Sequence, residues 1–211
     1  MSLSMRDVSL SAVVVMAACW AQPSRALDPR YPDWPCQQLK VPGISLASVW
    51  NGPSIEGIDS KPADTKEADM VTRLAARRTP IEDARKLIAD YLVGTDAEKQ
   101  DKATKLFAQL YSTLNAQRDE VMNGIERFSR KQKAAAEDIR AEAQKLRDLQ
   151  ANADQAQTED LASRLAWQTR IFEDRRQSTS YVCDVPVQIE KRLFDLGSAI
   201  QNALSADPAK K

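Results

Sequence analysis

Histidine is absent from this chain of 211 residues. Because histidine is the commonest general base and the commonest metal ligand, its absence excludes several kinds of active site within the chain. Ser-His-Asp and Cys-His catalysis, HExxH zinc sites and histidine-ligated haem are all excluded. The sequence also has no GxGxxG or GxxxxGKS/T nucleotide motif and no EF-hand loop. We therefore expect a protein that is not an enzyme and that holds neither a cofactor nor a metal ion.

Glycine and aromatic residues are scarce, with six glycines and an aromatic content of 6%. Both figures are more typical of helical proteins than of strand-rich ones. The formal net charge is zero, because the sequence contains 30 lysines and arginines and 30 aspartates and glutamates. Nucleic-acid-binding proteins usually carry a strong basic excess. The composition predicts an all-α protein with no nucleic-acid partner.

Only one long apolar run is present, at residues 8–21, and it is too short to cross a membrane as a helix. It follows a basic residue and precedes small residues at positions 24 and 26, which is the pattern of a secretory signal peptide. We predict that residues 1–26 are removed, and that the mature protein is periplasmic and has no membrane span. In an alternative interpretation, a lipobox ends at Cys19, whose lipid would anchor the protein to the envelope. An uncleaved anchor is a third alternative.

Two cysteines, Cys36 and Cys183, remain after removal of this segment. An even number of cysteines in an oxidising compartment predicts one disulfide, which would tie the start of the mature chain to its C-terminal region. The alternative, a redox-active or nucleophilic thiol, is supported by neither a CxxC spacing nor a histidine.

Residues 27–63 contain six of the ten prolines and three of the six glycines. Proline at this density interrupts both helices and sheet ladders. Regularly placed apolar residues distinguish the segment from a disordered linker, so we predict an irregular arm laid along a helical body. Trp34 and Trp50 have two interpretations. They fill the core, or, together with Tyr31, they form a docking surface for a partner, because Trp and Tyr dominate interface hot spots.

Part of this arm resembles a known family. Residues 33–42, DWPCQQLKVP, and 49–53, VWNGP, are similar to exported bacterial proteins of an uncharacterised family, over less than a seventh of the chain. The resemblance implies export and brings no activity with it.

Residues 64–204 show helical periodicity throughout. Asp64 and Glu67 predict a capping box that opens a first helix, which would run to about Arg78. Thr79 as N-cap before a proline predicts a second helix, terminated by Gly94. A further capping box at residues 95–98 starts the third helix at once, so neighbouring helices should pack together.

The third helix is predicted to run from about residue 96 to 151, continuous or mildly kinked at Gly124. Its apolar residues follow a heptad seam. The thirteen seam positions are Phe107, Tyr111, Leu114, Arg118, Val121, Ile125, Phe128, Gln132, Ala135, Ile139, Glu142, Leu146 and Leu149. In coiled coils, polar seam residues such as Arg118 and Gln132 fix the register or the partner. A purely local structural role is the alternative.

The rest of the chain is predicted to return along this helix. Residues 152–157 would form the turn and Thr158 the next N-cap, while Asp184 and Pro186 would break the returning helix. Residues 205–211 would be a frayed tail. The fold class is therefore an elongated antiparallel helical bundle or coiled-coil hairpin with an irregular proline-rich N-terminal arm.

Two functions fit this pattern. We favour a non-enzymatic periplasmic accessory or scaffold protein that binds an envelope protein through its bundle and arm, with self-association through the seam as a variant. The alternative is a periplasmic protein that binds a small molecule or a metal ion in a pocket lined by Trp34, Trp50 or Trp167. The pair Arg175-Arg176 is either ordinary surface charge or a grip for an anionic partner.

Overall fold

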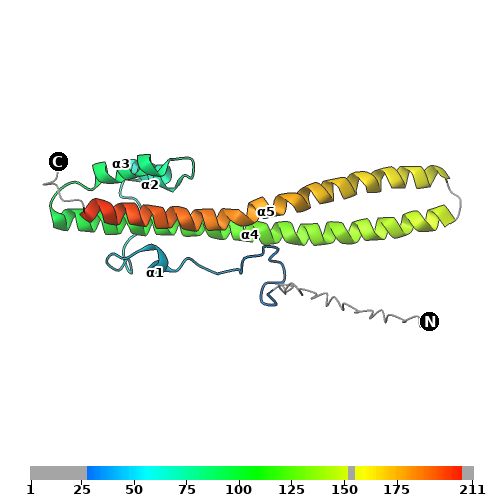
Figure 1. Ribbon diagram of the computed structural model, residues 1–211, viewed down its shortest axis with the longest axis horizontal. Helices are drawn as coiled ribbons and strands as arrows, with labels where there is room; N and C mark the ends of the chain where they lie inside the picture. The colour runs from blue at the N-terminus through cyan, green and yellow to red at the C-terminus, as the bar shows by residue number, and fades with distance from the viewer. Residues whose placement is uncertain (1–27, 152–154, 206–211) are drawn as a thin grey trace, which may run out of the picture.

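Helices and connecting loops make up the whole described structure, a computed structural model that covers residues 28–151 and 155–205, and these ranges contain no strand. The all-α prediction is confirmed. In chain order the helices are α1 (Leu46–Val49), α2 (Thr65–Ala75), α3 (Ile81–Tyr91), α4 (Asp96–Ala151) and α5 (Gln155–Ser205). The two long helices pack antiparallel as a hairpin, with α1 and the arm along one side of one half and α2 and α3 along the other (Figure 1).

The helix α4 is a single element of 56 residues and continues through Gly124, as predicted. Its start is the predicted capping box. The Thr95 amide donates to Glu98 Oε2 at 2.8 Å, and the Glu98 amide donates to Thr95 Oγ1 at 3.4 Å. These two bonds satisfy backbone donors that have no partner inside the helix.

The two short helices differ in detail from the prediction. Asp64 caps α2 by accepting from the Glu67 amide at 2.8 Å, but the helix ends at Ala75 and not near Arg78. The N-cap of α3 is Pro80, so Thr79 does not cap it. Gly94 has a φ of +125°, a conformation that suits glycine, and it lies two residues beyond the C-cap of α3.

The prediction of a broken return helix is wrong. The helix α5 begins at Gln155, so Thr158 lies inside it, and Pro186 also lies within the helix. An internal proline costs about 3 kcal/mol because it removes one backbone hydrogen bond. Here Pro186 and Ile189 are buried, and packing against α4 offsets that cost. Residues 155–157 of the predicted turn and Ser205 of the predicted tail also belong to α5, so both predictions are wrong there. The other residues of the turn, 152–154, and of the tail, 206–211, lie outside the described ranges.

Burial is concentrated in one half of the hairpin. The main core unites the arm and all five helices around nine large, fully buried side chains: Leu74, Ile88, Leu106, Phe107, Leu110, Leu114, Leu193, Leu196 and Ile200. Beyond Ser129, no residue of α4 is buried, and over the described part of α5 before Cys183 only Leu161 is. The predicted seam therefore continues along α4, but its distal half, from Gln132 to Leu149, is only half-buried.

The arm is packed most tightly at α1. The Trp50 indole stacks on the Phe107 ring, with 4.1 Å between ring centroids and 9° between planes. At the same place, the backbone of Val49 lies directly against Gly197 of α5. A Cβ atom at position 197 would lie 2.3 Å from the Val49 carbonyl oxygen. This glycine allows the close approach of the two backbones.

Arg192 joins α5 to the two short helices and was not singled out from the sequence. Its guanidinium donates to the Leu74 carbonyl from Nε at 2.9 Å and from Nη2 at 2.7 Å, and to the Thr79 carbonyl from Nη1 at 2.9 Å. The side chain is buried, and this burial lowers the pKa of Arg192. Its positive charge lies at the C-terminal end of α2, where the helix dipole is favourable to a cation.

Replacing Arg192 with methionine should lower the free energy of unfolding by about 2–3 kcal/mol, because two buried carbonyls lose their donors. Urea unfolding followed by circular dichroism measures the change. The matched control is Lys191→Met on the exposed face of the same helix, where only an exposed ion pair with Asp195 is lost and the change should stay within about 0.5 kcal/mol. Equal effects of the two substitutions would contradict this account of Arg192.

Candidate functional site

Cys36 and Cys183 form a disulfide, as predicted, across a sequence separation of 147 residues and with 5.6 Å between their Cα atoms. Both residues are buried in a small second core with Trp34, Met122 and Ile125. The bond fastens the arm to the middle of α5. It is compatible with an oxidising, exported compartment. The predicted signal peptide at 1–26 and the alternative lipidation residue Cys19 lie outside the described ranges.

The aromatic residues predicted to meet a partner are turned inward. Trp34 is 5% exposed and Trp50 is 6% exposed. Each indole donates to a nearby backbone carbonyl of the arm, that of Gln38 for Trp34 and that of Pro53 for Trp50, both at 2.7 Å. Tyr31 is half-buried beside the Trp34 cluster. The two tryptophans hold the arm in place, which matches the core-filling interpretation, and present almost no free surface to a partner.

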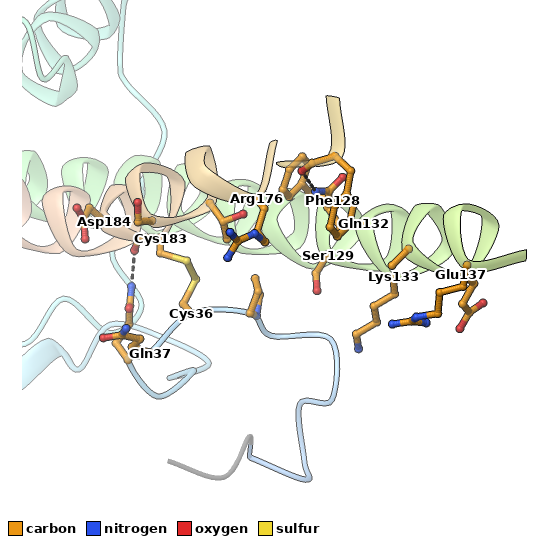
Figure 2. Close-up of a pocket in the computed structure, with 17 residues that line it drawn as sticks. Cys36, Gln37, Phe128, Ser129, Gln132, Lys133, Glu137, Arg176, Cys183 and Asp184 are labelled. Atoms are coloured by element: carbon orange, nitrogen blue, oxygen red, sulfur yellow. Dashed lines mark hydrogen bonds between the residues drawn. A yellow bond between two sulfur atoms is a disulfide. The ribbon is translucent and has the colours of Figure 1, made fainter. Parts of the chain in front are cut away.

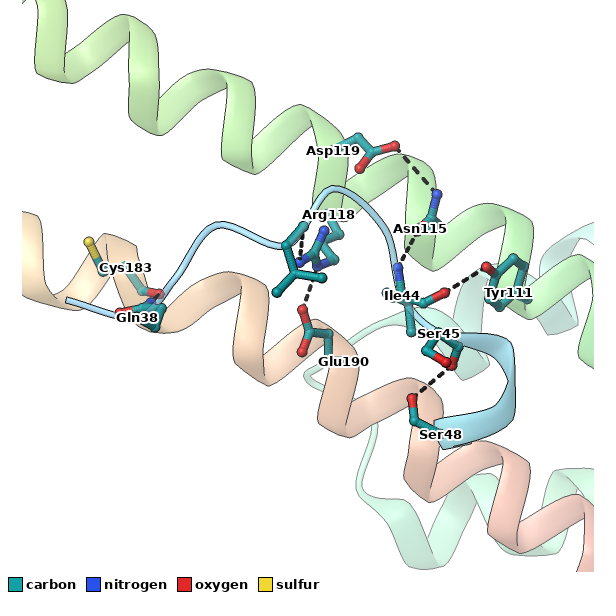
Figure 3. Close-up of polar contacts among 11 residues, drawn as sticks. Gln38, Ile44, Ser45, Ser48, Tyr111, Asn115, Arg118, Asp119, Cys183 and Glu190 are labelled. Carbon is teal, nitrogen blue, oxygen red and sulfur yellow. Dashed lines mark hydrogen bonds and ion pairs between the residues drawn. The ribbon is translucent and has the colours of Figure 1, made fainter. Parts of the chain in front are cut away.

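Arg118 is the residue that fixes the middle of the arm. Its side chain is 3% exposed, and it donates from Nη2 to the Val41 carbonyl at 2.8 Å and from Nε to the Glu190 carboxylate at 2.5 Å. It thereby links α4, the arm and α5 (Figure 3). Two further hydrogen bonds hold the arm on either side of Val41 (Figure 3). The side-chain amide of Gln38 donates to the Cys183 carbonyl, and the Tyr111 hydroxyl donates to the Ile44 carbonyl.

Gln132, the second polar seam residue, makes a weaker local contact. Its Nε2 donates to the Phe172 carbonyl of α5 at 3.4 Å. This bond places Phe172 opposite Gln132 in the antiparallel pair and so defines the register of the two helices at this level. Both polar seam residues thus make contacts within the chain.

Exposed apolar side chains occur on the arm and on the face of α5 that Arg118 links to it. We call this set the arm–α5 ridge, and it consists of Leu39, Val41, Val187 and Phe194, which are 72%, 53%, 51% and 51% exposed. Arg118 joins the Val41 carbonyl to Glu190, which lies on the same face of α5 as Val187 and Phe194 because helical residues three, four and seven apart share a face.

The ridge was not recognised from the sequence. Val187 and Phe194 lie seven residues apart and outside the buried stripe of α5, so their spacing was a usable signal. The two arm residues carry no such signal, because the arm has no periodicity.

A pocket of about 830 Å³ opens where the arm meets the two long helices, beside the disulfide (Figure 2). Its wall is formed by Pro35, Cys36, Gln37, Gln38, Phe128, Ser129, Gln132, Lys133, Ala136, Glu137, Arg140, Phe172, Arg176, Thr179, Ser180, Cys183 and Asp184. The volume is in the range of small-molecule sites, which in helical proteins often lie between helices. Sequence reasoning named six residues of this wall, Phe128, Gln132, Arg176, Asp184 and the two cysteines, but did not bring them together in one pocket.

The mouth of this pocket carries an ion-pair cluster between the arm and α4. Lys133 Nζ lies 2.8 Å and Arg130 Nη1 3.3 Å from the carboxylate of Asp33. The hydrogen bond from Lys133, reinforced by Arg130, holds the pKa of Asp33 below its ordinary value. The cluster connects residues 32–33 of the arm to α4, because Lys133 also donates to the Pro32 carbonyl at 2.6 Å.

Metal-ligating groups are not gathered in the part of the chain that the structure describes, where no three Cys, Asp or Glu side chains are placed to share an ion. Glu142, the one acid of the seam, accepts from Gln168 at 3.3 Å.

Trp50 borders a smaller pocket of about 260 Å³ next to Phe194, whereas Trp167 is 63% exposed on the distal part of α5. Among the described helices, none combines the length and the apolar character needed to cross a bilayer.

Comparison with known proteins adds no relative: the chain matches no protein-family model, no curated protein and no solved structure at a significant level.

Proposed function

We propose that this is an exported, non-enzymatic accessory protein that binds an envelope protein partner through the arm–α5 ridge. The observation that supports the proposal is the exposure of four apolar side chains on the arm and on the face of α5 that Arg118 links to it. Monomeric proteins rarely leave contiguous apolar surface uncovered, and such surface is typical of sites for protein partners. The ridge takes over the docking role that the sequence suggested for the buried aromatic residues of the arm.

The ridge is also preorganised. The disulfide fixes the arm just before Leu39, and Arg118 fixes it at Val41. A partner therefore does not have to order the arm, which reduces the entropy lost on binding. Of the charged residues between Val187 and Phe194, Glu190 is paired with Arg118 and Lys191 with Asp195, and Arg192 is buried. An apolar segment of a partner protein is the occupant that this surface suits.

The triple variant Leu39→Ser, Val187→Ser and Phe194→Ser should recover at least tenfold less partner after mild cross-linking of intact cells and affinity capture with mass spectrometry. All three side chains are at least half exposed, so the thermal unfolding of the variant should stay close to that of the wild type. Val93→Ser is the matched control, since Val93 is 58% exposed in the loop between α3 and α4.

An unchanged partner yield from the triple variant would refute the ridge as the binding surface. Sedimentation of the purified protein tests the self-association variant. A monomer at tens of micromolar, together with one stoichiometric envelope partner in the wild-type capture, is the expected result. A dimer that the triple variant abolishes would make the partner a second copy of the chain.

A further inference from the structure

We propose that the pocket beside the disulfide is a binding site for a small aromatic carboxylate. The proposal concerns a surface different from the arm–α5 ridge and does not depend on the partner. It rests on three features of the pocket wall: two aromatic rings without aromatic neighbours, a hydroxyl that lines the pocket, and basic side chains.

Phe128 of α4 and Phe172 of α5 supply the apolar part of the site. Both line the pocket and both are half-buried. Within the described chain, neither ring stacks on another aromatic ring, unlike Trp50 and Phe107 in the main core. A planar aromatic ligand between them would gain the contacts that these rings lack, because offset and edge-to-face aromatic pairs are favourable.

Ser129 supplies a hydrogen-bond donor. The residue is 7% exposed, lines the pocket, and its hydroxyl makes no hydrogen bond with any described residue. In Figure 2 the side chains of Ser129 and Lys133 leave α4 on the side that faces the arm. The hydroxyl oxygen is reached by solvent from the pocket, so water satisfies it in the free protein, and a ligand oxygen is the partner that we assign to it in the complex.

The basic side chains decide the charge of the ligand. Lys133, Arg140 and Arg176 line the pocket together with the two acids Glu137 and Asp184. Lys133 and Arg176 are ion-paired with Asp33 and Glu173, but both pairs are open to solvent, and exposed pairs are weak enough for a ligand carboxylate to replace the acid.

The helix register brings these groups to one level. Phe172 lies opposite Gln132, and the helices are antiparallel. Ser129 lies one turn before Gln132 on α4, and Arg176 lies one turn after Phe172 on α5. Because the helices run in opposite directions, these two residues lie at the same height along the hairpin. Since Arg side chains bind carboxylates through two parallel hydrogen bonds, a carboxylate fits this end of the pocket and an aromatic ring fits beside Phe172.

The test uses the oxidised mature protein and three naphthalene probes of nearly equal size in calorimetric titrations: 1-naphthoate, 1-naphthalenemethanol and 1-naphthylmethylammonium. We expect 1-naphthoate to bind saturably at one site, at least tenfold more tightly than the cation and more tightly than the neutral alcohol. Absence of saturable 1-naphthoate binding up to millimolar concentration, or equal binding of the cation, would overturn the proposal.

Adjacent arginines provide the matched variants, because Arg176 lines the pocket and Arg175 does not. Arg176→Gln should weaken 1-naphthoate binding about tenfold and remove the preference over the alcohol, whereas Arg175→Gln should leave the affinity within about twofold. Phe172→Leu, which keeps an apolar side chain, should also weaken binding. Equal effects of the two arginine variants would show that surface charge and not the pocket holds the anion. The triple ridge variant should bind 1-naphthoate with the affinity of the wild type. The two proposals can therefore fail independently, one by loss of the partner and the other by loss of 1-naphthoate binding.

Discussion

Replacing Gly197 with alanine is expected to lower the free energy of unfolding by about 2–3 kcal/mol, the upper range for overpacking a core. The added Cβ would lie 2.3 Å from the Val49 carbonyl oxygen and 3.1 Å from Cε2 of Phe107. Backbone and stacked rings occupy that space, so α1 would have to move off α5. The loss occurs although alanine is about 1 kcal/mol better than glycine in a helix interior. Chemical unfolding followed by circular dichroism measures it.

Gly124→Ala is the matched control, because it makes the same change inside the other long helix. A Cβ at position 124 would meet only the end of the Arg127 side chain, at 3.7 Å, an ordinary contact. With no steric clash at this position, the higher helix propensity of alanine determines the effect. The free energy of unfolding of the variant should be about 0.5–1 kcal/mol higher than that of the wild type. The two substitutions should thus have opposite signs. A stabilising Gly197→Ala would show that the close approach of α1 to α5 is wrong.

Removing the disulfide is expected to have the largest effect on stability. The double variant Cys36→Ala and Cys183→Ala should lose about 4–5 kcal/mol, the value that the chain-entropy model assigns to a loop longer than 100 residues. Cross-linking residues 147 positions apart restricts the unfolded chain strongly. Urea unfolding of the oxidised wild type and of the double variant measures the difference, and the reduced wild type is the control for the loss of buried sulfur.

Limited proteolysis should locate the effect of this change. Without the bond, the arm before Leu39 keeps the Trp34 packing, the contacts of Asp33 and Pro32 with α4 and the bond from the Gln38 side chain to the backbone carbonyl at position 183, so trypsin should cut faster at Arg30. The arm from Val41 onward should stay protected, since Arg118 and the Trp50 stack still hold it. A loss below about 1 kcal/mol, or an unchanged cleavage pattern, would contradict this role of the disulfide.

The local features of the fold were predictable because they depend on neighbouring residues. The capping boxes at Asp64 and Thr95 and the continuous helix through Gly124 follow from hydrogen bonds and periodicity over a few positions. The single disulfide followed from counting two cysteines. Where the prediction was wrong, a distant contact decided. Pro186 does not break α5, because the residues around it are buried against α4 and the arm.

The candidate sites needed the tertiary structure. A tryptophan in an irregular arm is equally consistent with a core residue and a contact residue, and only the position of Phe107 shows that Trp50 is in the core. The arm–α5 ridge joins residues of the arm to residues of α5 that lie about 150 positions further along the chain. No sequence period relates the two segments, so their proximity could not be read from either one.

The amino-acid sequence by itself determined an all-α hairpin with a proline-rich arm and one disulfide, because helix period, caps and cysteine number are local or countable properties. Which side chains the arm buries, where α5 tolerates Pro186, and which residues surround the pocket were decided by tertiary packing alone. The physical reason is that burial and pocket formation depend on the relative positions of the arm, α4 and α5 in space, to which residues far apart in the chain contribute jointly.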